Sequence, residues 1–308
     1  MPGYQRSKEF HGQSVVEFDP GGAGGVVPQG PAWHLSAPVS GPPEFHEVFE
    51  RFLGAVDTTQ VNVLVMGFTG FDGPAAATFL LEAADRFPNL QALFLGDERS
   101  FEWIWQTDLT PVAERFPLLE RLEVRGKQGL ELRPFHHAVL KTLRLESCCL
   151  PSDVMQAVAA SDLPVLERLD VWLGVDDGEG EVADEYDLEP VLSGERLPSL
   201  RFLGLENSAV QNEIAERVAT APVVARLRSL SLARGTLTDE GAESLLSGQP
   251  LTHLRRLDLH HHYLSEHMME RLRTAFPSTD VDLSGAMGEY HGPFDEEVYN
   301  FVADGRDF

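Results

Sequence analysis

The chain has 308 residues, with 49 acidic and 24 basic side chains and a formal net charge of −25. This charge repels polyanions, so it argues against nucleic acid or an anionic membrane as a partner and favours solubility or a basic partner. No apolar run is long enough to cross a bilayer, and the first 18 residues lack the apolar segment of a secretory signal. The only cysteines, Cys148 and Cys149, are adjacent and form no disulfide framework, so we expect a cytoplasmic protein.

The first 56 residues differ in composition from the rest. Residues 1–43 are rich in glycine and proline but also carry apolar patches around Val15 and Trp33. Residues 44–56 place apolar side chains on one helical face, namely Phe45, Val48, Phe49, Phe52 and Val56. We therefore expect an N-terminal extension and a capping helix over residues 1–56.

A short template, L-x-x-L-x-L, recurs from residue 90 to residue 259. Complete copies begin at Leu90, Leu140, Leu200, Leu227 and Leu254, near copies that end in valine begin at Leu119 and Leu166, and weaker ones lie around Val63 and Val281. Alternate side chains of a short strand point the same way, so the leucines of successive parallel strands would stack into one core. The first leucines lie 21 to 34 residues apart, which leaves room for a helix after most strands.

Helical spacing of apolar residues supports this cycle, and it predicts helices over residues 75–86, 153–160, 212–219, 239–246 and 266–276. Ser152, Thr238 and Ser265 stand at N-cap positions. Prolines such as Pro88 and Pro198 end the segments before the next strand. The pattern predicts an α/β solenoid over residues 57–284, a horseshoe with a concave parallel sheet and convex helices. Residues 285–308 would form a C-terminal cap or an acidic tail.

Several longer motifs carry a resemblance. They include residues 221–227, 235–254 and 257–266, and the shorter Trp33-His34-Leu35 and Val171-Trp172-Leu173-Gly174. Together they resemble a family of bacterial leucine-rich repeat proteins, common in actinomycetes, that has no assigned activity; its repeats are of the ribonuclease-inhibitor type. The resemblance covers about residues 9–284 and implies the solenoid fold and a scaffold or substrate-recruiting role beside enzymes. It implies no catalytic residues.

Function in such a solenoid is expected at the x positions, which fall in rows across the concave sheet. The middle rows combine arginines and acids around a tryptophan that we expect to be exposed, a composition typical of protein-binding hot spots. A loop over residues 98–108 adds two more tryptophans. The candidate binding residues are Arg125, Arg144, Glu146, Arg168, Asp170, Trp172, Glu206, Trp103 and Trp105. The alternatives are a ladder of ion pairs without a ligand and tryptophans that merely pack over the core.

The run His260-His261-His262 is the other chemical feature. His262 falls at the ninth repeat position, which normally points inward and bonds loop backbone; Cys148 holds the same position in its repeat, and we expect it to be buried. Asp258 and His260 could together hold a zinc ion, but imidazoles bonded to backbone groups are the preferred interpretation.

The acidic loop over residues 174–187 lacks calcium-loop spacing and is expected to be solvated. No nucleotide, nucleophile or zinc-protease motif is present, so we expect no enzyme, no cofactor and a protein or peptide partner bound by a monomer. The alternative is a metal-binding or accessory component of an enzyme system that uses the Asp258 and His260 region.

Overall fold

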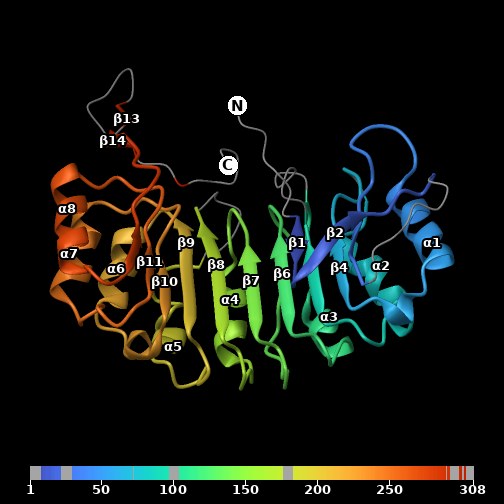
Figure 1. The fold of residues 1–308 in the computed structure, drawn as a ribbon, viewed down its shortest axis with the longest axis horizontal. Helices are drawn as coiled ribbons and strands as arrows, with labels where there is room; N and C mark the ends of the chain where they lie inside the picture. Colours follow the sequence, from blue (N-terminus) through green and yellow to red (C-terminus); the bar gives the residue numbers. More distant parts are fainter. Residues whose placement is uncertain are drawn as a thin grey trace.

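The computed structural model describes residues 8–21, 30–71, 73–96, 104–175, 183–288, 290–291, 298–299 and 302. Its main feature is one 12-stranded sheet in which the strands follow chain order from β1 to β12 (Figure 1). Every neighbouring pair from β2 onward is parallel, and only β1 and β2 are antiparallel. The prediction of a parallel sheet built from one strand per repeat is confirmed.

The strands are β1 Glu9–Phe10, β2 Gln13–Glu17, β3 Ala32–Leu35, β4 Val63–Met66, β5 Ala92–Leu95, β6 Arg121–Arg125, β7 Thr142–Glu146, β8 Arg168–Gly174, β9 Phe202–Ser208, β10 Ser229–Ser231, β11 Arg256–Asp258 and β12 Asp280–Asp282. A separate hairpin pairs β13 Tyr290–His291 with β14 Val298–Tyr299. The helices are α1 Phe45–Ala55, α2 Ala76–Glu82, α3 Thr110–Arg115, α4 Ser152–Ala160, α5 Glu189–Leu192, α6 Gln211–Val218, α7 Asp239–Ser247 and α8 Glu266–Ala275, with short 3₁₀ turns η1 Thr58–Gln60, η2 Ala84–Arg86 and η4 Pro222–Arg226.

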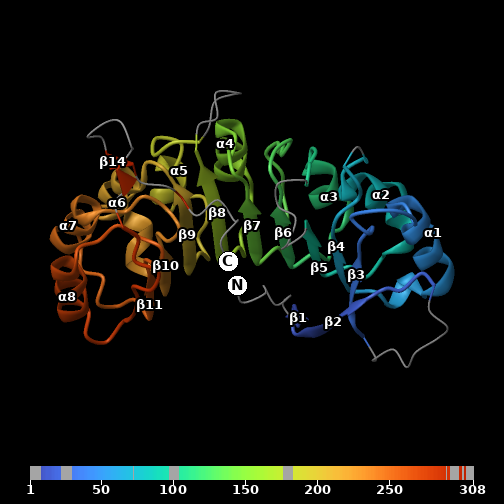
Figure 2. The same ribbon diagram turned by 90° about the horizontal axis from the view of Figure 1, so that it is seen from above.

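The sheet curves into an open arc, with the strands along its inner side and the helices along its outer side (Figure 2). Between the two layers lies a continuous apolar core that runs from Trp33 to Phe276. The template leucines form it: Leu93, Leu143 and Leu203, for example, are at most 1% exposed. Stacked repeats thus bury a core that no single repeat could bury alone. In the part of the chain that is described, no helix has both the length and the hydrophobicity needed to cross a membrane.

The sheet starts earlier in the chain than the leucine template indicates. Strands β2 and β3 lie within the glycine- and proline-rich residues 1–43 and pair in parallel with β4. Their apolar side chains explain this placement, since Trp33 and Leu35 are buried in the core. Helix α1 follows within residues 44–56 as expected and buries Phe45, Val48, Phe49 and Phe52.

The β1–β2 hairpin also occupies part of the inner face of the sheet. Phe10 packs in a small second cluster with Ala32, Val63, Val65 and Ala92, apart from the main core. The guanidinium carbon of Arg121 on β6 lies 4.5 Å from the centre of the Phe10 ring. The β1–β2 hairpin therefore covers part of the inner face over β3 to β6.

The predicted helices are present, with one correction at a helix start. Thr238 accepts a hydrogen bond from the Glu240 amide and Ser265 accepts one from the Met268 amide, as N-cap hydroxyls do. The N-cap expected at Ser152 is wrong: α4 starts one residue earlier, its N-cap residue is Pro151, and Ser152 is the first helical residue.

Candidate functional site

The rows predicted from the template exist as neighbouring positions in the sheet. One row runs Glu123, Arg144, Asp170, Gly204, Ser231 and Asp258, and the next runs Arg125, Glu146, Trp172 and Glu206. Neighbours in a parallel sheet lie about 4.8 Å apart, so charged side chains along a row can contact one another. We call the residues Arg125, Arg144, Glu146, Arg168, Asp170, Trp172, Glu206 and Arg234 the central cluster.

Trp172 is not exposed, and the expectation that it lies on an open surface is wrong. Its side chain is 1% exposed. The guanidinium carbons of Arg125 and Arg234 lie 5.0 and 5.1 Å from the centre of its ring, and its indole N–H donates to Glu206 Oε2 at 3.1 Å. Two arginine side chains thus cover the ring, and they are held there partly by cation–π attraction.

The carboxylates of the central cluster are buried as well. Glu146 is 2% exposed, accepts a hydrogen bond from Arg125 Nε through Oε2, and forms an ion pair with Arg144, whose Nη2 lies 2.5 Å from Glu146 Oε1. Asp170 accepts from Arg168 Nη1 at 3.1 Å. Buried acids are stable only when paired in this way, so each one fixes an arginine.

Two acids of the cluster approach each other across Gly204. A Cβ atom at this glycine would lie 2.6 Å from Asp170 Oδ1 and 3.2 Å from Glu206 Oε1, so no other residue fits without displacing a carboxylate. Burial and the neighbouring Asp170 charge raise the pKa of Glu206, although Ser231, Arg144 and Arg234 act in the opposite direction. Burial alone would lower the pKa of Arg144, but Glu146, Glu123 and the other carboxylates outweigh it and raise that pKa.

The accessible groups of the cluster are therefore arginines. The side chains of Arg144 and Arg168 are 32% and 41% exposed, whereas Glu146 and Asp170 are 3% and 12% exposed. Arg168 also lies over the half-buried ring of Phe202, 4.4 Å from its centre. The cluster presents guanidinium groups and one aromatic ring, and it keeps its carboxylates underneath.

Arg234 belongs to the site, but the repeat template does not identify it. It follows the strand region of its repeat, has a φ of +69°, and reaches back so that its Nε lies 3.7 Å from Glu206 Oε2. A non-glycine residue in this backbone region is uncommon and often marks a special role, but φ is not visible in a sequence. The signal available in the sequence was an arginine three residues after the end of β10.

The two loop tryptophans fare differently. Trp105 is 51% exposed, and its backbone forms an isolated parallel bridge with Gln128. About half of the Trp105 side chain is therefore accessible for contact. Trp103 lies outside the described residues, as do residues 176–182, half of the acidic loop over residues 174–187.

A second charged group joins β11 to β12. Arg256 Nη2 lies 2.9 Å from both Asp258 Oδ2 and Asp282 Oδ2, and His260 Nδ1 lies 2.7 Å from Asp258 Oδ1. Asp258, His260 and Asp282 are close enough to share a metal ion. Arg256 already pairs with both carboxylates, however, so an ion would have to displace a fork of charge-assisted hydrogen bonds. The arrangement fits an ion-pair ladder better than a metal site.

The Asp258 pairings predict a contribution to stability that disappears in acid. Burial opposes its ionisation, but hydrogen bonds from His260 and Arg256 outweigh burial and lower the pKa of Asp258 to about 2. A depressed pKa stabilises the folded state above the ordinary value of 3.8, and this contribution is lost as the pH falls toward 2. Asp258→Asn should therefore lose about 2 kcal/mol at pH 7. The urea midpoints of variant and wild type should converge between pH 4 and pH 2.

Asp280→Asn is the matched control, because Asp280 also pairs with Arg256 but its side chain is 69% exposed. This variant should keep the pH dependence of the wild type. A constant gap between Asp258→Asn and wild type down to pH 2 would contradict the prediction.

His262 has the structural role expected of it. Its ring is fully buried, Nε2 lies 3.2 Å from the Leu283 carbonyl oxygen, and Nδ1 accepts from the Leu264 amide. Burial lowers the pKa of His262, which keeps the ring neutral as these contacts require. Cys148 differs from expectation: it is half-buried rather than buried, and its thiol reaches the Lys127 carbonyl oxygen at 3.1 Å.

Comparison with known proteins supports the fold. No protein-family model and no curated protein sequence matches the chain. Among solved structures, a protein of Bacteroides fragilis superposes with a TM-score of 0.74 and 27% identity over 84% of this chain and 72% of its own. A leucine-rich repeat protein of Leptospira interrogans reaches a TM-score of 0.32 and 14% identity over 76% of this chain and 57% of its own. The first likeness supports the α/β fold, and the strand order with one leucine template per strand supports a leucine-rich-repeat-like solenoid.

Proposed function

We propose that the chain is a non-enzymatic scaffold that binds a protein or peptide on the inner face of its sheet, as a monomeric cytoplasmic horseshoe. The observation that carries the proposal is the layering of the central cluster, in which buried carboxylates hold the partly exposed side chains of Arg144 and Arg168 in place. The sequence motifs support placing the chain with bacterial leucine-rich repeat proteins of the actinomycete type.

Preorganisation is the physical basis of this function. An arginine on a surface normally loses rotamer freedom when it binds, at about 0.5–1.5 kcal/mol per side chain. Here Glu146 and Asp170 have already removed much of that freedom. The partner segment would offer carboxylate or carbonyl oxygens to Arg144 and Arg168 and an apolar side chain to Phe202.

The test is co-purification after cross-linking in the native host. The variant Arg144→Ala with Arg168→Ala should reduce partner recovery at least tenfold, because each lost charge-assisted hydrogen bond contributes about 1–2 kcal/mol. The control is Arg271→Ala with Arg273→Ala on α8, which removes two arginines of similar exposure, 40% and 55%. If both double variants recover the same partners as wild type, the inner face is not the binding surface.

A further inference from the structure

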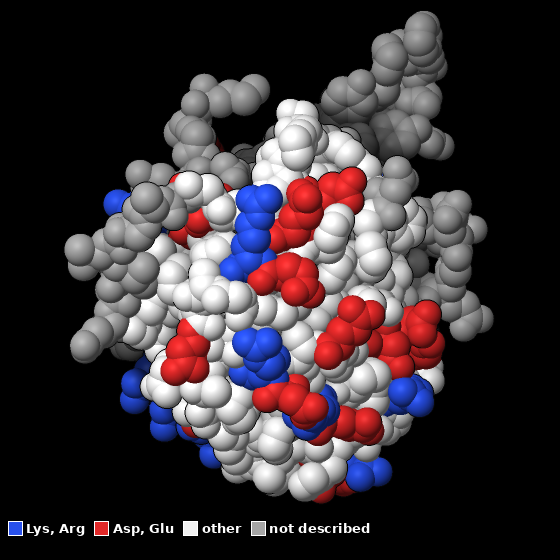
Figure 3. Space-filling view, turned by 90° about the vertical axis from the view of Figure 1, so that its right-hand side faces the viewer, with Lys and Arg blue, Asp and Glu red and all other residues white. Residues whose placement is uncertain are grey.

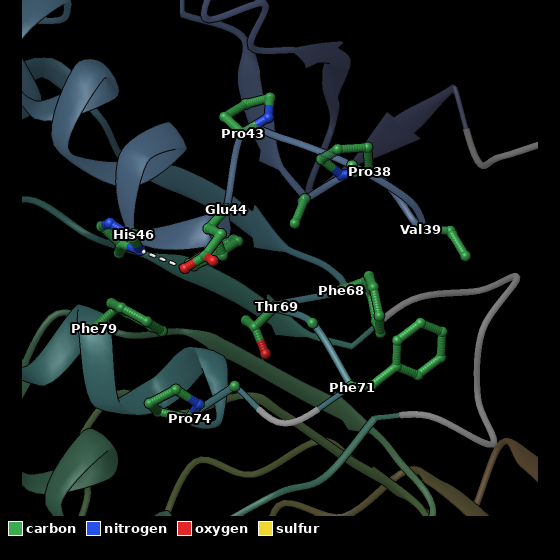
Figure 4. A pocket seen from close by; sticks show the side chains of 15 residues that line it. Pro38, Val39, Pro43, Glu44, His46, Phe68, Thr69, Phe71, Pro74 and Phe79 are labelled. Atoms are coloured by element: carbon green, nitrogen blue, oxygen red, sulfur yellow. Dashed lines mark ion pairs between the residues drawn. The ribbon is translucent and has the colours of Figure 1, made fainter.

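A pocket lies outside the central cluster, at the N-terminal end of the array. It has a volume of about 430 Å³ and lies between the loop after β3 and the loop after β4, next to the starts of α1 and α2 (Figure 4). This volume is within the range of ligand-binding pockets. The two loops are tied together, because the Ala37 amide donates to the Phe68 carbonyl oxygen at 2.7 Å.

Large apolar side chains form one part of the pocket's lining. Phe45 and Phe68 in its wall are 1% and 2% exposed, whereas Val39 and Phe71 are each 52% exposed. The Phe71 ring meets the Phe68 ring edge-on, with centroids 5.1 Å apart, so it stands at a defined position. Two large apolar side chains kept in water beside one cavity mark a surface that another molecule can cover.

Prolines restrict part of the pocket's wall. Pro38, Pro43 and Pro74 all line it, and each fixes its own φ near −65°. Gly41, Gly70 and Gly73 line it as well. The proline positions lose little conformational entropy when they are covered.

The polar groups of the pocket are gathered at one side. Figure 4 shows the Glu44 carboxylate and the Thr69 hydroxyl facing the space near Phe79, with Phe68, Phe71 and Val39 opposite. Glu44 lies 3.3 Å from His46 Nδ1, and its side chain is 80% exposed. Among the described residues that line the pocket, Glu44 is the one acid, and none is lysine or arginine.

The charged groups inside the pocket, rather than a large charged surface around it, must select the molecule that binds there. Figure 3 shows acidic and basic side chains interspersed over the N-terminal end of the molecule, so this end presents no large patch of either sign. Glu44 is the charged acid that the described lining supplies, and the net charge of −25 favours a cation in the same sense. A cationic group beside an apolar group complements this arrangement.

We propose that the pocket binds a peptide segment of a partner protein in which an apolar side chain stands next to lysine or arginine. The apolar side chain packs against Phe68 and Phe71, and the cation pairs with the Glu44 carboxylate. The open mouth favours a peptide, since a small molecule would need to be largely enclosed, whereas a side chain arrives attached to a larger body. The site goes beyond the proposed function, because it is separate from the central cluster.

The experiment screens a display library of random 12-residue peptides on the immobilised full-length protein. Enriched sequences should carry an aromatic or branched apolar residue followed or preceded by lysine or arginine. A synthetic peptide of the enriched sequence should bind Phe71→Asp at least tenfold more weakly, because the substitution places a charge in the apolar wall. Leu118→Asp, which changes a leucine of 45% exposure elsewhere, should bind as wild type does.

A charge series completes the test. Glu44→Gln should weaken binding two- to fivefold, as expected for an exposed ion pair, and should not affect the same peptide with its basic residue replaced by alanine. The Arg144→Ala and Arg168→Ala variant should bind the peptide as wild type does. A failure of the pocket proposal is therefore distinguishable from a failure of the proposed function of the inner face. No enrichment, enrichment without a basic residue, or undiminished binding to Phe71→Asp would each overturn the proposal.

Discussion

Replacing Trp172 by alanine is expected to lower the free energy of unfolding by about 3–5 kcal/mol, the range for a large aromatic removed from a packed site. The indole is 1% exposed and donates to Glu206, while Arg125 and Arg234 cover its ring. The substitution would leave a cavity under two arginines and remove the hydrogen bond to a buried carboxylate. Urea unfolding followed by circular dichroism measures the effect.

Trp105→Ala is the matched control, because it removes the same side chain from a site that is 51% exposed. Its effect should stay within about 0.5 kcal/mol, as for most surface substitutions. A loss below about 1 kcal/mol for Trp172→Ala would contradict the structural role of the cluster. The expected loss also means that Trp172 is unsuited to a binding test, since an unfolded variant loses every partner. Arg144→Ala with Arg168→Ala also unpairs the buried carboxylates of Glu146 and Asp170, so its circular dichroism spectrum must match that of the wild type before partner recovery is compared.

Replacing Gly174 by alanine should destabilise the protein by about 3 kcal/mol. This glycine ends β8 with a φ of +81°, and a Cβ atom there would lie 1.7 Å from the Cys148 carbonyl oxygen. The left-handed conformation alone accounts for about 1–2 kcal/mol in a residue with a side chain. Relieving the overlap would also move the Cys148 carbonyl away from the Val175 amide that donates to it at 2.8 Å, a hydrogen bond of about 1 kcal/mol.

Gly12→Ala separates the two causes. Gly12 has a φ of +72°, but no atom lies within 4 Å of the position that a Cβ would take. Its substitution should therefore show only the backbone penalty, about 1–2 kcal/mol. Thermal unfolding of the two variants side by side measures the difference. Equal losses would show that the contact between Gly174 and Cys148 adds nothing.

The repeat spacing was sufficient to predict the sheet and its register. The leucine template identifies which residues point inward, and parallel pairing then aligns the positions between them, so Arg144 was correctly expected beside Asp170. The weak copies at both ends also proved to be strands, β4 and β12. These results follow because burial of the leucine core fixes the register of every strand.

Burial on the inner face could not be predicted in the same way. A position between template leucines points away from the core, so Trp172 was expected to be exposed. The burial of Trp172 on β8 depends on Arg125, which lies two strands away on β6, and on Arg234, which lies outside the template. Long side chains that fold over a neighbour leave no periodic signal. The role of the central cluster in binding stays a prediction.

The N-terminal pocket was missed for another reason. Its walls come from two loops about thirty residues apart, which contain Val39 and Phe71, and it exists only because neighbouring strands bring these loops together. Strands β2 and β3 were missed as well, because the glycines and prolines of residues 1–43 suggested an irregular extension. The apolar residues around Val15 and Trp33 were the available signal, and a parallel partner in β4 gave them their role.

The two ends of the array are fastened by different forces. A terminal repeat has a neighbour on one side only, so fraying begins there. At the C-terminal end Arg256 joins β11 to β12 through Asp258 and Asp282. At the N-terminal end, aromatic rings pack together, with centroids 5.3 to 6.5 Å apart: Phe18, Trp33, Phe52 and Phe87. Added salt screens the ion pairs of Arg256 but does not weaken the aromatic packing. We therefore expect higher ionic strength to favour unfolding from the C-terminal end.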